Sequence, residues 1–388
     1  MKLLPSAKKI RSIAPSVTEK EISLVTEAVC EGWMDQMNMH LDQFVQEFAA
    51  YTGQKFCLPV SHGTDAIQLA LKVIGVGPGD EVIVPDITWV ASASPVLHLG
   101  ATVVLADIDD QRWCLCPSAF ERAITARTKA VVCVDLFGAM PDYEQIMAIA
   151  ARHNIVVIED AAEGLGSRYK GHPAGTLGHI GIYSFNATKL IMGGQGGMLV
   201  TNVEDWYRKA KRLAHHGIDI ELSGKYYWSN ELGYNYNWCN LNAALALAQL
   251  RRIDELIEFK RNLFNTYKEQ FAECRWIQLV APIPDVFNCH WITCAWLDPA
   301  LGINKEQMRD KCLPYNVDIR PFFYPLSDMP PFKGNLTISG QNTNSYKLSD
   351  QMICLPSGYD LTAADLIYVC DLLKMILNQA AIDAGLTL

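Results

Sequence analysis

The sequence predicts an α/β protein, with a large domain built on a mostly parallel central sheet and a smaller C-terminal α+β domain. Three observations lead to this prediction. Short runs rich in Val and Ile alternate with segments of helical spacing through the first half of the chain. Nearly continuous apolar runs are typical of parallel strands that are buried on both faces. With 388 residues, of which 50% are hydrophobic, the chain is long enough to form two cores.

In the first half, predicted helices alternate with predicted strands, as expected for parallel strands that need crossover connections. The predicted helices cover residues 64–75, 88–100 and 142–154. The predicted strands cover residues 80–85, 102–108, 130–138 and 155–162. Side chains with chemical functions are expected at the carboxyl ends of such strands.

In the second half, the spacing changes and predicts a different unit. A strand over 180–185 is followed by Lys189, by a cluster of glycines at 193, 194, 196 and 197, and by a second strand in the stretch that ends at Thr201. Residues 240–271 have the apolar period of one long helix, which would carry the chain from the large domain into the small one. We place the boundary near Arg252, which gives domains of 1–252 and 253–388. A strand over 289–297, a Pro-rich stretch over 319–332 and a last helix over 363–380 follow.

Composition argues against several classes of function. The net charge is −9 without a basic block, so a nucleic-acid partner is not expected. No apolar run approaches the roughly 20 residues that span a bilayer. The 12 cysteines are scattered, and Cys114 and Cys116 lack a second pair, so we expect no metal site. Reduced thiols and the absence of an apolar core after "MKLLPSAKKIRS" favour a cytoplasmic protein.

Two of the predicted strand ends carry polar motifs that suit charged groups of a ligand. Ser61 to Thr64 precede a helix, where free backbone N–H groups and the helix dipole favour a phosphate, although an ordinary helix cap fits equally well. Asp160 closes an apolar strand, so its carboxylate needs a cation or hydrogen-bond donors. A structural cap is the alternative for Asp160.

The third motif is "GIYSFNATKLIMGGQGGMLVT", residues 181–201. Ser184 ends a strand, and Lys189 follows in apolar surroundings beside glycines that let the backbone approach a ligand. A solvated surface lysine is the alternative. An amine in such a place can lose its proton near neutral pH and attack a carbonyl.

Together the three motifs predict one cofactor, pyridoxal 5′-phosphate, which needs a lysine for a Schiff base, an acid at its ring nitrogen and a phosphate cup. Lys189 and Asp160 would supply the first two. Gly63, Thr64 and Ser184 would hold the phosphate. Trp89 would stack on the ring, with a core aromatic as the alternative.

The motifs resemble the DegT/StrS family of nucleotide-sugar aminotransferases over nearly the whole chain. The resemblance is carried by "SHGTDAIQLAL", "GDEVIVPDITWVASASPV", "VVIEDAAEGLGSRYKG", "GIYSFNATK", "GGQGGMLVT" and "ELGYNY…LNAALALAQLRRID". It implies the aspartate-aminotransferase fold (fold type I), a homodimer, and a second role for Lys189 as proton carrier. It also implies that Asp160 pairs with the pyridine nitrogen and that Glu163 lies near the phenolic oxygen of the cofactor.

The resemblance also implies partners. Asn235 would reach the phosphate from the neighbouring subunit, and Arg320 would contact substrate, with a surface salt bridge as the alternative. The amino donor would be L-glutamate and the acceptor a nucleotide-linked keto sugar. The stretch 318–332 looks most like that of members that aminate C4 of GDP-4-keto-6-deoxymannose; a UDP- or dTDP-linked sugar stays open. Four positions depart from the usual family pattern and bear on substrate choice: His62, Gln195, Asn237 and Ser327.

Three rival functions are disfavoured. Sugar dehydratases of the same fold resemble this chain but carry His at the position of Lys189. A non-catalytic regulator need not retain Lys189, Asp160 and Ser184 together. The glycines of "GGQGGM" come before a strand rather than between a strand and a helix, so a dinucleotide-binding dehydrogenase is the weakest of the three rivals.

Overall fold

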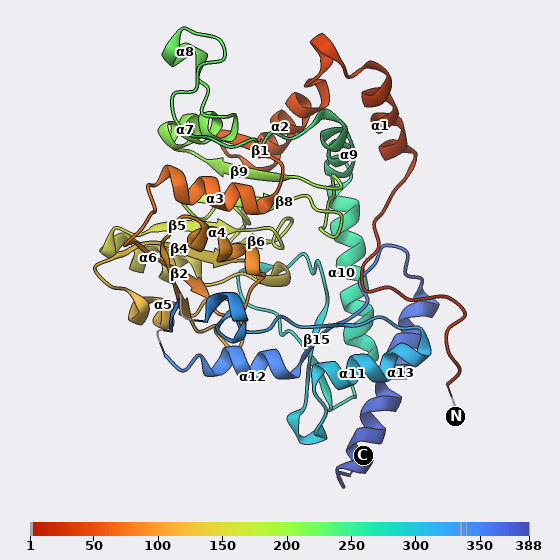
Figure 1. Ribbon diagram of the computed structural model, residues 1–388. Coiled ribbons are helices and arrows are strands. Elements are labelled where there is room, and N and C mark those ends of the chain that lie inside the picture. Colours follow the sequence, from red (N-terminus) through yellow and green to blue (C-terminus); the bar gives the residue numbers. More distant parts are fainter. Residues whose placement is uncertain (1–2, 334–335, 339, 388) are drawn as a thin grey trace.

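The computed structural model describes residues 3–333, 336–338 and 340–387. Its main feature is an eight-stranded sheet with the order β1-β9-β8-β5-β4-β2-β3-β14 (Figure 1). Among these strands β9 alone runs against the others, since it pairs antiparallel with both β1 and β8. The predicted α/β architecture with a mostly parallel sheet is confirmed.

The strands of this sheet are short, and helices fill most of the connections between them. The strands are β1 (Phe56–Val60), β2 (Glu81–Pro85), β3 (Thr102–Ala106), β4 (Thr128–Val134), β5 (Val156–Asp160), β8 (Ile180–Ser184), β9 (Gly197–Thr201) and β14 (Leu336–Ile338). The α-helices of this part are α1 (Glu19–Glu31), α2 (Met39–Thr52), α3 (Gly63–Val73), α4 (Ser94–His98), α5 (Pro117–Ala123), α6 (Tyr143–His153), α7 (Glu204–Ala214) and α8 (Ile220–Ser223). The short 3-10 turns are η1 (Met34–Gln36), η2 (Val90–Ser92) and η3 (Leu136–Gly138).

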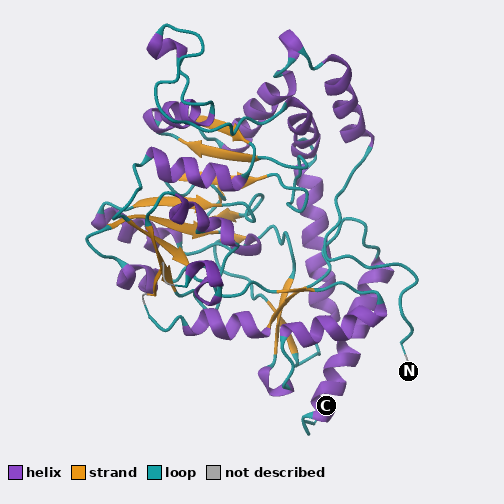
Figure 2. Cartoon of the chain, viewed as in Figure 1, coloured by secondary structure: helices purple, strands orange, loops and turns teal. Residues whose placement is uncertain are grey.

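Burial explains why these runs form parallel strands. Every residue of β2 is buried, and β4 and β5 are buried beyond their first residues. Both faces of the sheet are therefore covered, as the Val/Ile runs predicted. Figure 2 shows the strands stacked between helices.

The C-terminal part forms a second, smaller unit with its own core. A four-stranded antiparallel sheet has the order β10-β12-β15-β13. Its strands are β10 (Ile277–Leu279), β12 (Cys294–Leu297), β13 (Arg320–Pro321) and β15 (Met352–Cys354). The α-helices of the second half of the chain are α9 (Asn240–Leu250), which packs on α1 and α2 of the large part, and α10 (Ile253–Gln270), α11 (Lys305–Cys312), α12 (Thr343–Gln351) and α13 (Ala363–Asp383). The 3-10 turns are η4 (Pro299–Leu301), η5 (Leu313–Tyr315), η6 (Leu326–Asp328) and η7 (Pro330–Phe332).

A three-stranded ribbon, with the order β11-β6-β7, joins the two parts of the chain. It consists of β6 (Arg168–Tyr169), β7 (His172–Pro173) and β11 (Val286–Phe287). Two other segments also cross the predicted boundary. Ile10 packs in the core of the second unit, and β14 pairs with β3 of the large sheet. The division into 1–252 and 253–388 therefore stays a prediction.

The prediction of one helix over 240–271 is wrong, because the helix is interrupted at Arg251 and Arg252 between α9 and α10. Arg252 leaves the helical conformation (φ −114°, ψ 12°) and caps α10. Its guanidinium is buried and bonds Glu21 of α1 at 2.6 Å and Glu255 at 2.7 Å. The apolar period continues through the break, so the sequence pattern did not reveal this ion-pair cluster.

Two smaller boundaries were also wrong. Residues 88–100 were predicted as a helix, but they form η2 and the short α4, with Pro95 near the start of the latter. The strand predicted over 130–138 ends at Val134 and turns into η3, where Phe137 has a φ of 53°. Both changes occur beside the cavity described below.

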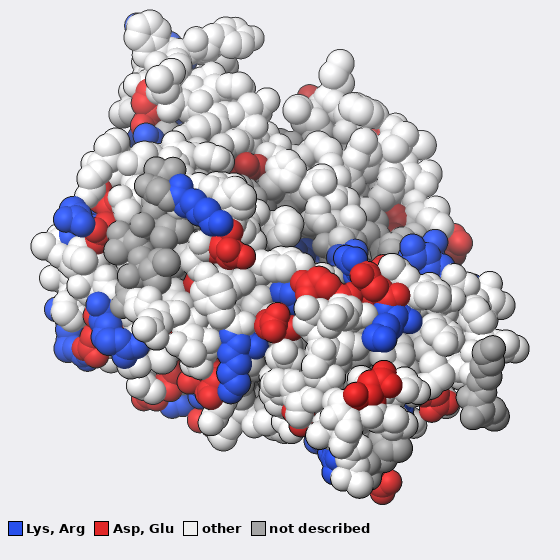
Figure 3. Space-filling view, turned by 60° about the horizontal axis from the view of Figure 1, so that its bottom comes forward, with Lys and Arg blue, Asp and Glu red and all other residues white. Residues whose placement is uncertain are grey.

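The surface carries charges of both signs. On the face shown in Figure 3, Lys and Arg side chains are interspersed with Asp and Glu. Among the residues that the structure describes, no helix combines the length and the apolarity that crossing a lipid bilayer requires.

Candidate active site

A cavity of about 370 Å³ opens at the carboxyl ends of the central strands. We call two parts of its lining by name. The sheet wall is formed by the segments 62–64, 88–92, 160–163 and 184–189, and the C-terminal wall is the segment 320–324, of which Arg320 and Phe323 line the cavity. Eight of the nine predicted site residues line the cavity, namely Gly63, Thr64, Trp89, Asp160, Glu163, Ser184, Lys189 and Arg320. The ninth is Asn235.

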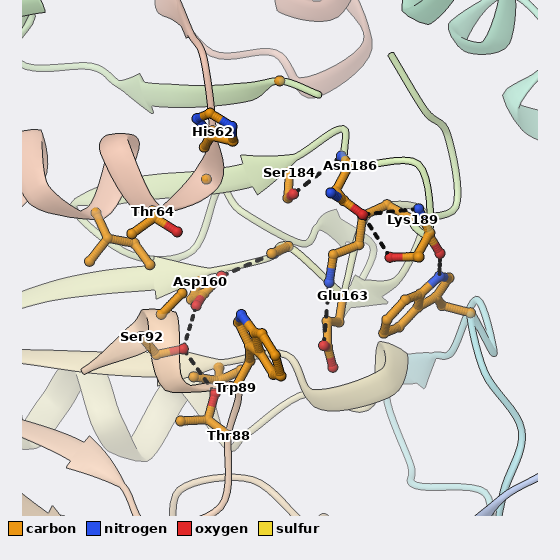
Figure 4. Close-up of a pocket in the computed structure, with 18 of the residues that line it drawn as sticks. His62, Thr64, Thr88, Trp89, Ser92, Asp160, Glu163, Ser184, Asn186 and Lys189 are labelled. Carbon is orange, nitrogen blue, oxygen red and sulfur yellow. Dashed lines mark hydrogen bonds and ion pairs between the residues drawn. The ribbon is translucent and has the colours of Figure 1, made fainter. Parts of the chain in front are cut away.

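Lys189 reaches the cavity from the loop between β8 and β9 (Figure 4). Its Nζ lies 3.3 Å from Oε1 of Glu163 and 4.3 Å from the ring centroid of Trp291. The side chain is 14% exposed, so the amine is shielded but accessible from the cavity. The surface-lysine alternative is therefore excluded by the geometry.

Glycine permits this loop to approach the start of α3. Gly196 has a φ of 146°, and a Cβ at Gly197 would collide with the backbone of His62. His62 and Gly196 form a bridge between the two segments. The close contact places the amine and the N-terminus of α3 on one rigid surface.

Asp160 ends β5 and is 5% exposed. Its Oδ2 accepts a hydrogen bond of 2.7 Å from Ser92 Oγ, and its Oδ1 accepts one of 3.2 Å from the N–H of Ala162. Burial raises the pKa of Asp160, while these two hydrogen bonds and the charge of Lys189 lower it. No basic side chain pairs directly with Asp160 in the described residues, so the carboxylate is suited to a cation brought by a ligand.

Glu163 lies in different surroundings although it follows Asp160 by only three residues. Its Oε2 accepts a hydrogen bond of 3.2 Å from the N–H of Phe137, and its Oε1 faces Lys189. Burial raises the pKa of Glu163 and the charge of Lys189 lowers it. The left-handed conformation of Phe137 in η3 presents that N–H group.

The start of α3 is free to bind an anion. His62 occupies its N-cap position without a capping hydrogen bond from a side chain, so the N–H groups of the first turn are available to a ligand. Gly63 packs closely against Ser184, since a Cβ there would lie 3.2 Å from Ser184 Cβ. The start of α3 with Ser184 fits the phosphate of pyridoxal phosphate. The buried carboxylate of Asp160 fits its ring nitrogen, and the shielded amine of Lys189 fits its aldehyde.

Of the four positions that depart from the family pattern, two line the cavity and a third lies just outside its lining. Gln195 lines the cavity and accepts a bond of 3.2 Å from Asn186 Nδ2. His62 also lines the cavity, and its Nδ1 lies 3.0 Å from Asp65. Ser327 lies outside the lining, where its Oγ donates to Asp86 at 2.7 Å.

Asn237, the fourth, bonds His215 at 2.9 Å and Asn235 at 3.3 Å. Asn235 is exposed and does not line the cavity of its own chain. The prediction that it acts on a neighbouring subunit stays a prediction.

Sequence reasoning missed the residues that position Asp160 and Lys189. Thr88 Oγ1 bonds Ser92 Oγ at 2.8 Å, and both hydroxyls are buried. Their spacing of four residues, within a segment predicted as a helix, is the only sequence signal for this chain of hydroxyls. Trp291 lies against Lys189 and donates a hydrogen bond of 2.9 Å to the carbonyl of Thr188. It is about a hundred residues away from Lys189 in the sequence, so the motif over 181–201 gave no sign of it.

The model of the DegT/DnrJ/EryC1/StrS aminotransferase family matches residues 15–374. The chain belongs to this family. The aminotransferase is 35% identical to the GDP-perosamine synthase of Escherichia coli O157:H7, over 92% of this chain and 95% of the relative. It is 34% identical to the GDP-perosamine synthase of Caulobacter vibrioides, over 95% of this chain and 98% of the relative.

The fold of the aminotransferase is likewise that of solved structures. It matches the Streptococcus pneumoniae protein Spr1654 in the PMP form with a TM-score of 0.89 and 25% identity, over 96% of this chain and 100% of the other. Spr1654 was also solved in a PLP form. The aminotransferase is a pyridoxal-phosphate enzyme of fold type I that acts on a nucleotide sugar.

Proposed function

We propose that the aminotransferase moves the amino group of L-glutamate to C4 of GDP-4-keto-6-deoxymannose and so forms GDP-perosamine. The observation that carries the proposal is the presence of Lys189 and Asp160 in one cavity. The names of the two relatives above support the choice of sugar. Keto sugars linked to UDP or dTDP are the alternatives that an experiment must separate.

We assign the cofactor to the residues that fit it. Lys189 would bind the aldehyde, Asp160 the ring nitrogen, and Ser184 with the first turn of α3 the phosphate. When bound, pyridoxal phosphate supplies a carbonyl for the amine and a ring that accepts the electron pair released as a proton leaves carbon. Trp89, exposed in the cavity, is positioned to cover one face of that ring.

Lys189 moves the protons. Its Nζ accepts a proton from the α-carbon of glutamate in the first half-reaction and returns one to the sugar carbon in the second. Glu163, 3.3 Å away, stabilises the protonated amine, and the face of Trp291 adds a cation–π contact. Asp160 would keep a proton on the ring nitrogen, because Ser92 orients its carboxylate and no basic side chain among the described residues pairs with it.

The C-terminal wall would select the substrates. Arg320 lines the cavity as the cation of this wall and is proposed to contact the anionic substrate. The ring of Phe323 lies 6.0 Å from that of Trp89, so the two aromatics limit the entry of water to the reacting atoms.

We further propose a homodimer with shared active sites. Large apolar side chains are exposed on two segments at the top of Figure 1, which is unusual for a free surface. They are Ile22, Val29, Trp33, Met34 and Met37 on the first segment, and Ile220, Leu222, Tyr226, Tyr227, Trp228 and Leu232 on the second. Asn235 follows directly after the second segment, which supports its assignment to the partner's site.

The proposed function is tested by absorbance. The protein loaded with pyridoxal phosphate should absorb in the visible range and lose this band when glutamate is added. A panel of keto sugars linked to GDP, UDP and dTDP is then added separately. We expect GDP-4-keto-6-deoxymannose to restore the band, and restoration by another sugar alone would overturn the choice of substrate.

The shared site is tested by mixing two inactive variants. Lys189→Ala and Asn235→Ala subunits are combined at limiting pyridoxal phosphate. If Asn235 acts across the dimer, half of the sites in each mixed dimer regain both residues, and activity rises above that of either variant. If Asn235 acts within its own chain, mixing restores nothing.

A further inference from the structure

We propose that Lys305, which lies outside the cavity, is a positioning residue that fixes the C-terminal wall and thereby sets the affinity for the sugar nucleotide. The inference rests on the proposed function for the identity of that ligand. Lys305 is the first residue of α11 and lies behind the wall, away from the cofactor residues. It has no part in the chemistry described above.

The ammonium of Lys305 joins the wall to α11 and α12. Its Nζ donates to the carbonyls of Phe322 at 3.1 Å and Phe323 at 3.4 Å, and to Ser349 Oγ at 2.8 Å. Ser349 Oγ donates in turn to the carbonyl of Phe323 at 2.7 Å. The ring of Tyr324 lies 3.7 Å from the same Nζ. Three consecutive residues of the wall are therefore held by one charge.

This placement is energetically unfavourable for a lysine without such partners. Lys305 is 2% exposed, and burial of an ammonium is costly unless it is fully hydrogen-bonded. It also stands in the first turn of a helix, where the helix dipole disfavours a cation. A neutral residue would serve packing better, so the charge is best explained by the carbonyls that it holds.

The wall transmits this constraint to the cavity. Phe323 lines the cavity and packs against Phe137, with ring centroids 5.2 Å apart and an interplanar angle of 22°. Phe137 supplies the N–H group that holds Glu163. Since the proposed cofactor contacts lie on the sheet wall between residues 63 and 189, a looser C-terminal wall should weaken substrate binding more than cofactor binding.

The charge state of Lys305 gives the proposal a pH signature. Burial lowers the pKa of Lys305 to about 8, and the charges of Glu306, Asp350 and Cys354 oppose this shift. Facing it from the wall, Tyr324 bonds Glu306 at 2.6 Å, which raises the pKa of Tyr324 to about 12. Lys305 is thus the group that loses its charge near pH 8, and the wall should loosen above that pH.

The first measurement uses Lys305→Met, with Lys311→Met on the exposed side of the same helix as control. We expect the KM for GDP-4-keto-6-deoxymannose to rise about tenfold in Lys305→Met, as for the loss of a charged hydrogen-bond donor. The Kd for pyridoxal phosphate should stay within twofold. In the wild type the sugar KM should rise above pH 8, and this rise should be absent in Lys305→Met. An unchanged sugar KM, or an equal change in Lys311→Met, overturns the proposal.

The second measurement needs no substrate and so separates this proposal from the proposed function. Hydrogen exchange of the amides of residues 322–324, corrected for the intrinsic rate, should accelerate in Lys305→Met and in the wild type above pH 8. If Lys305→Met does not fold, Ser349→Ala removes one partner of the ammonium and should give a smaller acceleration. Exchange that is the same in wild type and variant, and flat across pH 8, overturns the proposal.

Discussion

The two walls of the cavity are held in different ways. The sheet wall takes its side chains from the ends of strands that are buried on both faces, and its polar groups bond neighbours on the same wall, as Ser92 does with Asp160. The C-terminal wall includes the two-residue strand β13 and is held from behind by Lys305.

Side chains also fix the segment that follows the C-terminal wall. Asp86, at the end of β2, accepts bonds from the N–H and Oγ of Ser327 and from Asn342 Nδ2. Asp107, beyond β3, accepts bonds from Ser345. The reaction groups on the sheet wall are thus held by the strands themselves. The substrate side depends instead on a few hydrogen bonds from side chains, each of which a single substitution could remove.

The largest effect should follow from loss of the amine. Lys189→Ala removes both the covalent anchor and the proton carrier, so turnover should fall by about 10⁴-fold or more. The visible absorbance of the bound cofactor should also disappear. A Lys189→Ala protein that still completes turnover would contradict the assignment of the sheet wall as the reactive side.

A smaller loss is expected for Asp160→Asn, which keeps the shape of the side chain but cannot hold a positive charge on the cofactor ring. The rate of the glutamate half-reaction should fall by about 10²- to 10³-fold, corresponding to roughly 3–4 kcal/mol. Stopped-flow absorbance measures it. Because Glu163 remains beside Lys189, a full rate in Asp160→Asn would show that the two acids can exchange roles.

The comparison predicts a different outcome for Asp86→Asn. This change turns an acceptor of three hydrogen bonds into a group that presents N–H to donors, so the free energy of unfolding should fall by about 2–4 kcal/mol. The KM for the sugar should rise, and the Kd for pyridoxal phosphate should stay within twofold. Thermal unfolding and cofactor titration check both points, with the exposed Asp110→Asn as control. Equal losses of sugar and cofactor affinity would show that the walls are not independent.

The mildest change is Ser92→Ala. The hydrogen bond from Ser92 lowers the pKa of Asp160, which burial raises. Its removal should raise that pKa further, so the carboxylate becomes protonated at a higher pH. The acid limb of the pH profile of kcat/KM should therefore move upward, and the rate at neutral pH should fall about tenfold. A limb that moves downward would assign the titration to another group.

The two walls also differ in how far the sequence predicted them. Lys189, Asp160 and Ser184 follow from strand ends, because a parallel sheet brings such ends to one edge whatever the loops do. The hydroxyls of Thr88 and Ser92 were missed, since their segment was predicted as a plain helix and forms η2 and α4 instead.

The partners of the C-terminal wall could not be predicted. The contact of Lys305 with Phe322 depends on the packing of α11 beside β13, and no local pattern encodes that packing. The break at Arg252 was missed for the same reason, because its partner Glu21 is distant in sequence. Interactions that join remote segments leave no periodic signal, so they were visible only in three dimensions.

The docking of residues 327 and 342–345 on β2 and β3 has a consequence for biosynthesis. A ribosome releases the reactive half of the cavity long before it releases the segment that completes the other half. Until then Asp86 and Asp107 lack the donors that Ser327, Asn342 and Ser345 provide. The substrate side of the cavity is thus completed only after its reactive side has been synthesised.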